Sequence, residues 1–367
     1  MNRKINGYAA RIVAAALATA VLALAGCGGA NNQAKEEPTD LVWPLPPEQP
    51  RIKYVRSISA PEDIGAGEGT SLAEALLGKE KKEQDISIRK PYGVHADKDG
   101  RILVADTGWG GLLVFDPVNR KFDMFGTEGP GTLSQTLGVT SDSQGRIYVT
   151  DGQQDRVVVF DRDGKFLMAM GGKGVLEQPA GIVVNEALGR IYVVDVKKHH
   201  IAVFNMQGDL VSTIGERGVE PGQFNFPTNL AVGRDGKLYV MDTMNFRVQI
   251  LDPDGNPINS FGRAGTNAGE FARPKGIAVD SEGHIYVIDA AFSNFQIFNA
   301  DGALLLFVGE LGGRPGQLWL PAGAYIDAQD RLYIADQYNH RISVFQYLGA
   351  PEEPLAPESA PAETPAQ

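Results

Sequence analysis

The sequence repeats one pattern six times, and this repeat limits the chain to a small number of folds. The segment from Pro274 to Asp289 has five relatives along the chain. The acidic residues that end the six copies are Asp106, Asp151, Asp195, Asp242, Asp289 and Asp336. They follow one another at intervals of 45, 44, 47, 47 and 47 residues. A period of this length predicts a propeller or a solenoid with one supersecondary unit per repeat.

Each repeat carries the pattern of short strands. An apolar run leads through a polar turn to a second apolar run that ends at the Asp. Nine residues after each Asp comes the apolar residue that ends a third strand: Phe115, Phe160, Phe204, Leu251, Phe298 and Phe345. In the middle repeats a second turn introduces a fourth strand. The pattern therefore predicts an all-β fold, a six-bladed β-propeller with four antiparallel strands per blade.

The last repeat lacks a fourth strand of its own, because the chain enters a Pro-rich tail after Tyr347. An unpaired edge there would leave the ring open. The segment from Arg51 to Ile58 alternates apolar and polar residues like a half-exposed strand. We expect it to pair with residues 342–347, so that an N-terminal strand closes the ring in the last blade.

Two substitutions suggest a backbone requirement. The residue before the first strand is glycine in five repeats and Asn229 in the fourth, and one turn glycine is replaced by Asp330. Asn and Asp are the residues that tolerate a positive φ best after glycine. We therefore expect a positive φ at both positions.

The repeats resemble the NHL repeat, and Tyr338-Asn339-His340-Arg341-Ile342 is close to the signature that names it. The resemblance covers residues 51–348. The order of a lipobox, a Trp-Pro-rich spacer and six repeats also resembles a group of bacterial six-bladed NHL lipoproteins. Within that group, the resemblance implies an association of some members with multihaem cytochrome export systems.

The first 26 residues read as an export signal. Three basic residues precede the apolar stretch from Ile12 to Ala25, which is too short to span a bilayer comfortably. The stretch ends in Leu24-Ala25-Gly26-Cys27, which resembles the lipobox of bacterial lipoproteins. That resemblance implies lipidation of Cys27, a membrane anchor and a location in the bacterial cell envelope. Gly28 after the Cys favours the outer membrane, and residues 27–50 and 349–367 read as a Pro-rich tether and a disordered tail.

The charge and the cysteine count narrow the chemistry. Removing the signal leaves 34 − 3 = 31 basic and 45 acidic residues, a net charge of −14. Nucleic acid is therefore not an expected partner, although a negative net charge does not exclude a local basic patch. A single Cys leaves no disulfide, Cys-ligated metal or C-x-x-C-H haem site within the chain.

Three groups of residues are candidate sites. The residues expected to face the channel are small or apolar, except His95 and Tyr325, which are either a polar ligand site or a hydrogen-bonded plug. The loops after the second strands carry residues that either form a partner platform or wedge between blades: Trp109, Met244, Phe246, Phe292, Tyr338 and His340. The six repeated Asp residues are better explained by turn amides and a following Arg than by a metal site.

We therefore expect a lipid-anchored scaffold that docks a protein of the cell envelope. The scaffold is monomeric or part of a hetero-complex, and the candidate partners are a multihaem cytochrome and an export complex. No catalytic residue, metal ligand or cofactor is assigned. One alternative is a metal-dependent lyase or lactonase-like enzyme acting at the channel mouth, because the peptide-amidating lyase domain is an NHL-like propeller. Another is a carbohydrate- or peptide-binding module that uses the aromatic loops. Fold alone does not decide among these.

Overall fold

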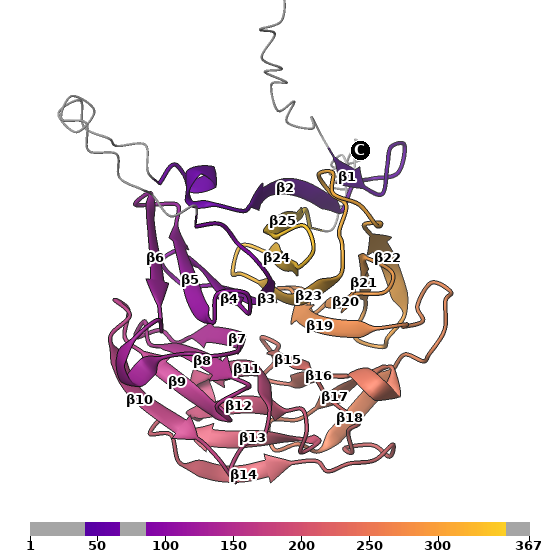
Figure 1. Ribbon diagram of the computed structural model, residues 1–367. Helices are drawn as coiled ribbons and strands as arrows, with labels where there is room; N and C mark the ends of the chain where they lie inside the picture. Colours follow the sequence, from indigo (N-terminus) through magenta and orange to yellow (C-terminus); the bar gives the residue numbers. More distant parts are fainter. Residues whose placement is uncertain (1–40, 67–85, 350–367) are drawn as a thin grey trace, which may run out of the picture. The chain divides into compact units, whose positions relative to one another are not determined.

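The computed structural model describes residues 41–66 and 86–349, and in them the chain forms a ring of six β-sheets (Figure 1). Five of the sheets have four strands, and the sixth has five. Neighbouring strands within each sheet run antiparallel. The predicted six-bladed propeller is confirmed.

Each of the first three blades is built from four strands that are consecutive in the chain. Blade one contains β3 (Pro91–Ala96), β4 (Ile102–Asp106), β5 (Gly111–Asp116) and β6 (Lys121–Phe125). Blade two contains β7 (Thr136–Ser141), β8 (Ile147–Asp151), β9 (Arg156–Phe160) and β10 (Phe166–Gly171). Blade three contains β11 (Pro179–Asn185), β12 (Arg190–Asp195), β13 (His200–Asn205) and β14 (Leu210–Ile214).

The last three blades include the one that closes the ring. Blade four contains β15 (Asn229–Val232), β16 (Leu238–Asp242), β17 (Arg247–Leu251) and β18 (Pro257–Phe261). Blade five contains β19 (Pro274–Val279), β20 (Ile285–Asp289), β21 (Asn294–Phe298) and β22 (Leu304–Val308). Blade six contains β23 (Pro321–Ile326), β24 (Arg331–Asp336), β25 (Arg341–Tyr347), β2 (Ile52–Ile58) and β1 (Val42–Trp43). Short 3₁₀ turns lie at η1 (Pro61–Ile64), η2 (Gly129–Gly131), η3 (Glu186–Leu188) and η4 (Thr243–Asn245).

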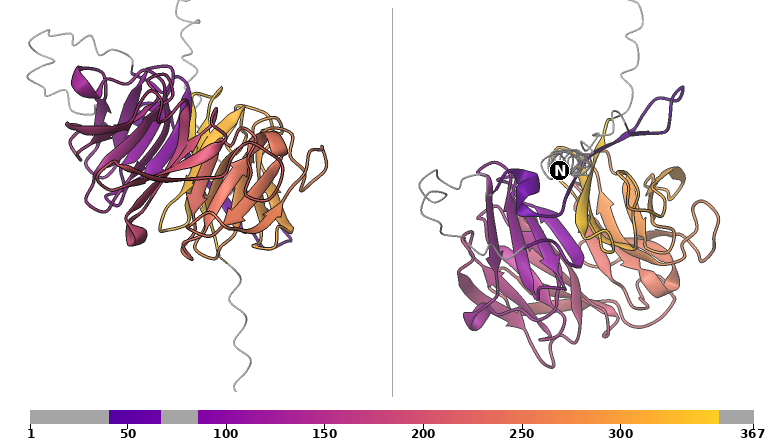
Figure 2. Two further views of the ribbon diagram at one scale, coloured as in Figure 1. Left: turned by 90° about the horizontal axis from the view of Figure 1, so that it is seen from below. Right: turned by 45° about the horizontal axis from the view of Figure 1, so that its top comes forward.

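The ring closes as the sequence predicts. Strand β2 pairs antiparallel with β25, with Ile52 opposite Tyr347 and Ile58 opposite Ile342. Both isoleucines are fully buried. Figure 2 shows the indigo N-terminal strand beside the yellow C-terminal strand. Strand β1 adds to the same sheet, so part of the segment predicted as tether, from residue 41 onward, is folded against blade six.

The core lies between the blades. Each of six clusters of buried apolar side chains combines residues from two neighbouring blades within the described part of the chain. The residues that end the third strands are all fully buried or nearly so: Phe115, Phe160, Phe204, Leu251, Phe298 and Phe345. The repeated apolar position of the sequence is therefore the contact that each blade makes with its neighbours.

The glycines at the start of the inner strands have a different role from the one expected. A Cβ on Gly138 would lie 2.2 Å from the carbonyl oxygen of Ala180 in the next blade, and one on Gly93 would lie 2.4 Å from that of Leu137. Neither these glycines nor Asn229 has a positive φ, so the expectation was wrong at this position. Close approach between inner strands is the reason for glycine here. The second expectation holds, because Asp330 has a φ of 57°.

Candidate functional site

The six repeated aspartates are buried and hold backbone turns. Asp289 accepts hydrogen bonds from the backbone N–H groups of Ala272, Arg273 and Ala291 at 2.8–3.1 Å. Arg341 donates from Nε to Asp336 at 2.9 Å, and Arg247 donates in the same way to Asp242 at 2.8 Å. These contacts confirm the structural interpretation of the repeated acid.

The expected arginine contact is absent from blade two in the described structure. Arg156 donates instead to the carbonyl oxygens of Pro130 and Thr132. Asp151 there is occupied by the backbone N–H groups of Ser134 and Gln135, at 2.8 and 3.0 Å. The turn amides are therefore the general partner of the repeated Asp, and the arginine is a partner in some blades.

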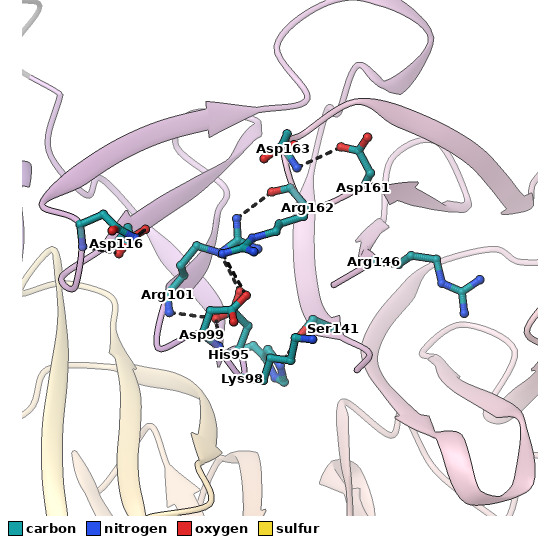
Figure 3. A network of polar contacts seen from close by, with 12 residues as sticks. His95, Lys98, Asp99, Arg101, Asp116, Ser141, Arg146, Asp161, Arg162 and Asp163 are labelled. Atoms are coloured by element: carbon teal, nitrogen blue, oxygen red, sulfur yellow. Dashed lines mark hydrogen bonds and ion pairs between the residues drawn. The ribbon is translucent and has the colours of Figure 1, made fainter. Parts of the chain in front are cut away.

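The inner strands line a narrow channel of about 100 Å³. The residues predicted to face it all line it: His95, Thr140, Val183, Ala231, Ala278 and Tyr325. The rings of His95 and Tyr325 lie 4.2 Å apart between centroids, so the structure brings these two side chains together across blades one and six. His95 Nε2 also lies 2.9 Å from the Ser141 hydroxyl of blade two (Figure 3).

Burial controls the protonation of both channel side chains. It lowers the pKa of His95 to about 3, which keeps the imidazole neutral at physiological pH. It raises the pKa of Tyr325 to about 12, with Asp327 and Asp97 adding to the effect. Two neutral rings in contact, with His95 hydrogen-bonded to Ser141, fit the plug that the sequence left open as the alternative to a ligand site.

One end of the channel opens among acidic turns. The cavity there, about 580 Å³, is lined by five acidic and two basic side chains: Asp97, Asp99, Asp142, Glu186, Asp327, Lys98 and Arg331. Several of the acids are neutralised, since Arg101 lies 2.7 Å from Asp97 and Arg331 lies 2.7 Å from Asp327. Figure 3 shows that Arg101 also reaches the carbonyl oxygen of Arg162 and so links blades one and two.

The opposite end of the channel opens into a larger and cationic cavity of about 1150 Å³, which we call the cationic mouth. Tyr92 and Leu137 line both the cationic mouth and the channel, so the two spaces are continuous. Among the described residues that line it, only Asp155 and Glu177 supply negative charge. Its basic side chains are Lys90, Lys173, Lys197, Lys198, Arg273 and Lys275.

The cationic mouth is the feature that the sequence interpretation missed. The net negative charge of the chain gave no sign of this cavity. Its basic residues come from four blades or their connections, with no more than two from any one of them. One signal was available. The residue before the inner-strand glycine is neutral in most repeats and is lysine only at Lys275.

The predicted aromatic platform divides into packed and exposed members. Trp109 donates from Nε1 to the carbonyl oxygen of Ser87 and packs against the core, with the Arg89 guanidinium 3.3 Å from its ring centroid. Phe246 also packs against the core, and Phe292 is half-buried. Met244 and Tyr338 are each 50% exposed, and His340 is exposed.

Two exposed aromatic residues extend this face beyond the prediction. The Trp319 ring is 45% exposed and stacks on Tyr338 with centroids 5.5 Å apart. Phe226 is 40% exposed, and the centroid of its ring lies 4.4 Å from that of the His199 ring. The sequence interpretation considered only the loops after the second strands, whereas Trp319 and Phe226 lie just before the first strands of their blades.

Comparison with known families identifies the repeat. The NHL repeat model matches residues 176–204 and 318–345, in blades three and six. A model described as a 6-bladed beta-propeller matches residues 229–310. The chain is a six-bladed β-propeller that contains NHL repeats. No protein of the curated set matches it.

Solved structures share the fold of this NHL propeller at low sequence identity. A streptogramin B lyase structure is 15% identical, with a TM-score of 0.55 over 71% of this chain and 95% of that one. The virginiamycin B lyase from Staphylococcus aureus is 14% identical, with a TM-score of 0.54 over 71% and 95%. Hydrazine synthase from Kuenenia stuttgartiensis is 11% identical, with a TM-score of 0.52 over 73% and 99%. These likenesses establish the architecture and leave function to the site.

Two further observations concern metals and membranes. Within the described residues of the NHL propeller, no group of three or more His, Cys, Asp or Glu side chains is arranged to hold a metal ion. The same residues include no helix with the length and hydropathy needed to cross a bilayer. The export signal, Cys27 and the tail beyond residue 349 lie outside the described residues.

Proposed function

We propose that the protein is a lipid-anchored scaffold of the bacterial cell envelope that docks another envelope protein through one face of its propeller. The lipid would be carried by Cys27, and the docking face is the one that holds the loops after the second strands. The partner class is an envelope protein, with a multihaem cytochrome or an export complex suggested by the resemblance to bacterial NHL lipoproteins.

The observation that carries the proposal is the exposed aromatic pair of Trp319 and Tyr338. The backbone N–H of Tyr338 donates to the carbonyl oxygen of Trp319 at 3.1 Å, and the N–H of Trp319 donates to Asp336 at 2.8 Å. These hydrogen bonds hold the backbone of both residues, and the two rings contact each other without a partner. Rigid exposed aromatic side chains contribute large contact area at a low entropic cost.

Crosslinking in native membranes tests the docking. The wild-type protein should capture a defined envelope protein, and the double variant Trp319→Ala/Tyr338→Ala should lose most of that capture. The matched control is Val211→Ala, because Val211 is 61% exposed on the outer strand β14. Equal capture by both variants would rule out this face as the docking surface.

The anchor needs a separate measurement. We expect Cys27→Ser to move the protein from the membrane fraction to the soluble fraction without a change in its melting temperature, because the propeller begins beyond the anchor. A Cys27→Ser protein that stayed membrane-bound after a carbonate wash would contradict lipid anchoring.

A further inference from the structure

The inner ring of the propeller contains a lysine that the fold does not require. The residue before the inner-strand glycine, or before Asn229, is neutral in the other five blades: Tyr92, Leu137, Ala180, Thr228 and Ala322. Blades one, two, three and six reach a close approach to their neighbours without a charge at this position. Lys275 in blade five is therefore not needed for ring closure.

Lys275 has no negative partner among residues 41–66 and 86–349. Its side chain is half-buried, and its Nζ lies 5.5 Å from the centroid of the Tyr92 ring. Among the described residues, no carboxylate lies within ion-pair distance of Lys275, Arg273 or Lys90. Burial, together with the nearby charges of Arg273 and Lys90, lowers the pKa of Lys275 to about 8. A half-buried ammonium without a counter-charge costs folding free energy.

The backbone places the two neighbouring cations at equivalent positions. The N–H of Lys90 donates to Asp106 at 3.0 Å, and the N–H of Arg273 donates to Asp289 at 3.1 Å. Both residues directly precede an inner strand, β3 in blade one and β19 in blade five. Two buried carboxylates thus fix the points from which two basic side chains enter the cationic mouth.

We propose that the cationic mouth binds a small organic anion whose carboxylate or phosphate group lies between Lys275, Arg273 and Lys90. The negative charge of the ligand pairs with Lys275, for which the described residues provide no counter-charge. Ser134, Gln135 and Gln178 line the same cavity and offer hydrogen bonds to polar groups elsewhere on the ligand. A cavity of about 1150 Å³ has room for a metabolite-sized molecule. The site lies on the docking face and Tyr338 is part of its lining, but anion binding there can be measured without a partner protein.

Calorimetric titration of the full-length protein in detergent tests the site, with citrate and pyrophosphate as the two probes at low ionic strength. We expect saturable binding of at least one probe at a single site, and the stronger of the two identifies carboxylate or phosphate as the preferred group. Lys275→Met and Arg273→Gln should each weaken binding at least tenfold. Lys275→Met should also raise the melting temperature of the unliganded protein, since methionine needs no counter-charge.

The matched control is Lys98→Met, which removes the same charge at the opposite, acidic end of the channel. It should change the affinity less than twofold. Absence of saturable binding by either probe would overturn the proposal, and so would an equal loss in Lys98→Met and Lys275→Met, which would indicate a general charge effect. Binding of an oligoglutamate peptide with no binding of either small anion would also overturn it, in favour of an acidic protein segment. Capture of a partner by the aromatic pair is measured separately by crosslinking, so failure of anion binding and failure of docking are distinguishable.

Discussion

At the scale of single residues, the two ends and the middle of the channel differ in how charge is handled. Acids at one end have arginine partners, as in the 2.7 Å contact of Asp97 with Arg101. In the middle, burial keeps His95 neutral. At the cationic mouth, no carboxylate in the described part of the chain pairs with Lys275. Only the last arrangement lacks a structural explanation, which is why it carries the ligand proposal.

The protonation of His95 makes a prediction about acid stability. Its pKa is about 3 in the folded protein and 6.5 when unperturbed. Between these values the unfolded chain binds a proton that the folded protein does not, so stability falls as the pH drops from 6.5 toward 3. We expect His95→Gln to lose this contribution. The stability difference between wild type and variant should change by several kcal/mol across the window, at ~1.4 kcal/mol per pH unit.

His284 provides the contrasting control, measured by urea unfolding at a series of pH values. Its hydrogen bond to Asp280 raises its pKa, so the stabilisation is complete below pH 6.5 and is lost as the pH rises through the folded pKa. His284→Gln should therefore alter the pH profile in the opposite direction. A wild-type profile parallel to that of His95→Gln would show that His95 takes up protons freely in the fold.

At the scale of elements, the inner strands depend on close contact. The Gly138 N–H donates to the Thr150 hydroxyl at 2.7 Å, and that hydroxyl donates to the carbonyl oxygen of Ala180 in blade three at 2.7 Å. These two hydrogen bonds join blade two to blade three, whose inner strands are in direct contact at this point. Both the glycine and the threonine are buried, so the contact cannot relax into solvent.

We expect Gly138→Ala to lower the free energy of unfolding by about 3 kcal/mol or more, since overpacking of this kind forces backbone movement. The new Cβ would lie 2.2 Å from the Ala180 carbonyl oxygen. Gly313→Ala is the matched control, because its nearest neighbour would be the Asn339 side chain at 3.4 Å. Chemical denaturation of both variants measures the difference. Similar small losses in the two variants would mean that the blades can separate without cost.

At the scale of the whole molecule, stability depends on closing the ring. Strand β2 joins two ends of the propeller that are almost 300 residues apart, and Tyr54 packs edge-on against Phe345 with centroids 5.5 Å apart. A blade buries its apolar faces only against neighbours, so an open ring would expose two faces to solvent.

We expect the double variant Ile52→Ala/Ile58→Ala to melt at a much lower temperature and still in one transition, because each truncation of a fully buried isoleucine costs about 3 kcal/mol. Val55→Ala is the control, as Val55 is 47% exposed on the same strand. Differential scanning calorimetry distinguishes the outcomes. Five blades that melted at the wild-type temperature, after an earlier transition of blade six, would contradict closure as the source of cooperativity.

Much of the architecture could be predicted because each blade repeats the same physical solution. The buried Asp and the apolar end of the third strand each recur six times, at intervals of 44 to 47 residues, so an error at one copy is corrected by the others. The closing strand could be predicted because the last repeat has no fourth strand of its own to pair with its third. The pairing of His95 with Tyr325 followed from the neighbourhood of blades one and six.

The sequence by itself determined the propeller, its number of blades and its closure, since these depend on local hydrophobic periodicity and on the need to pair every strand edge. Only the tertiary structure decided the role of the inner glycines and the gathering of Lys90, Arg273 and Lys275 at one mouth. Both depend on distances between blades that are far apart in sequence. Periodicity within one repeat carries no information about those distances, whereas the closed ring fixes them.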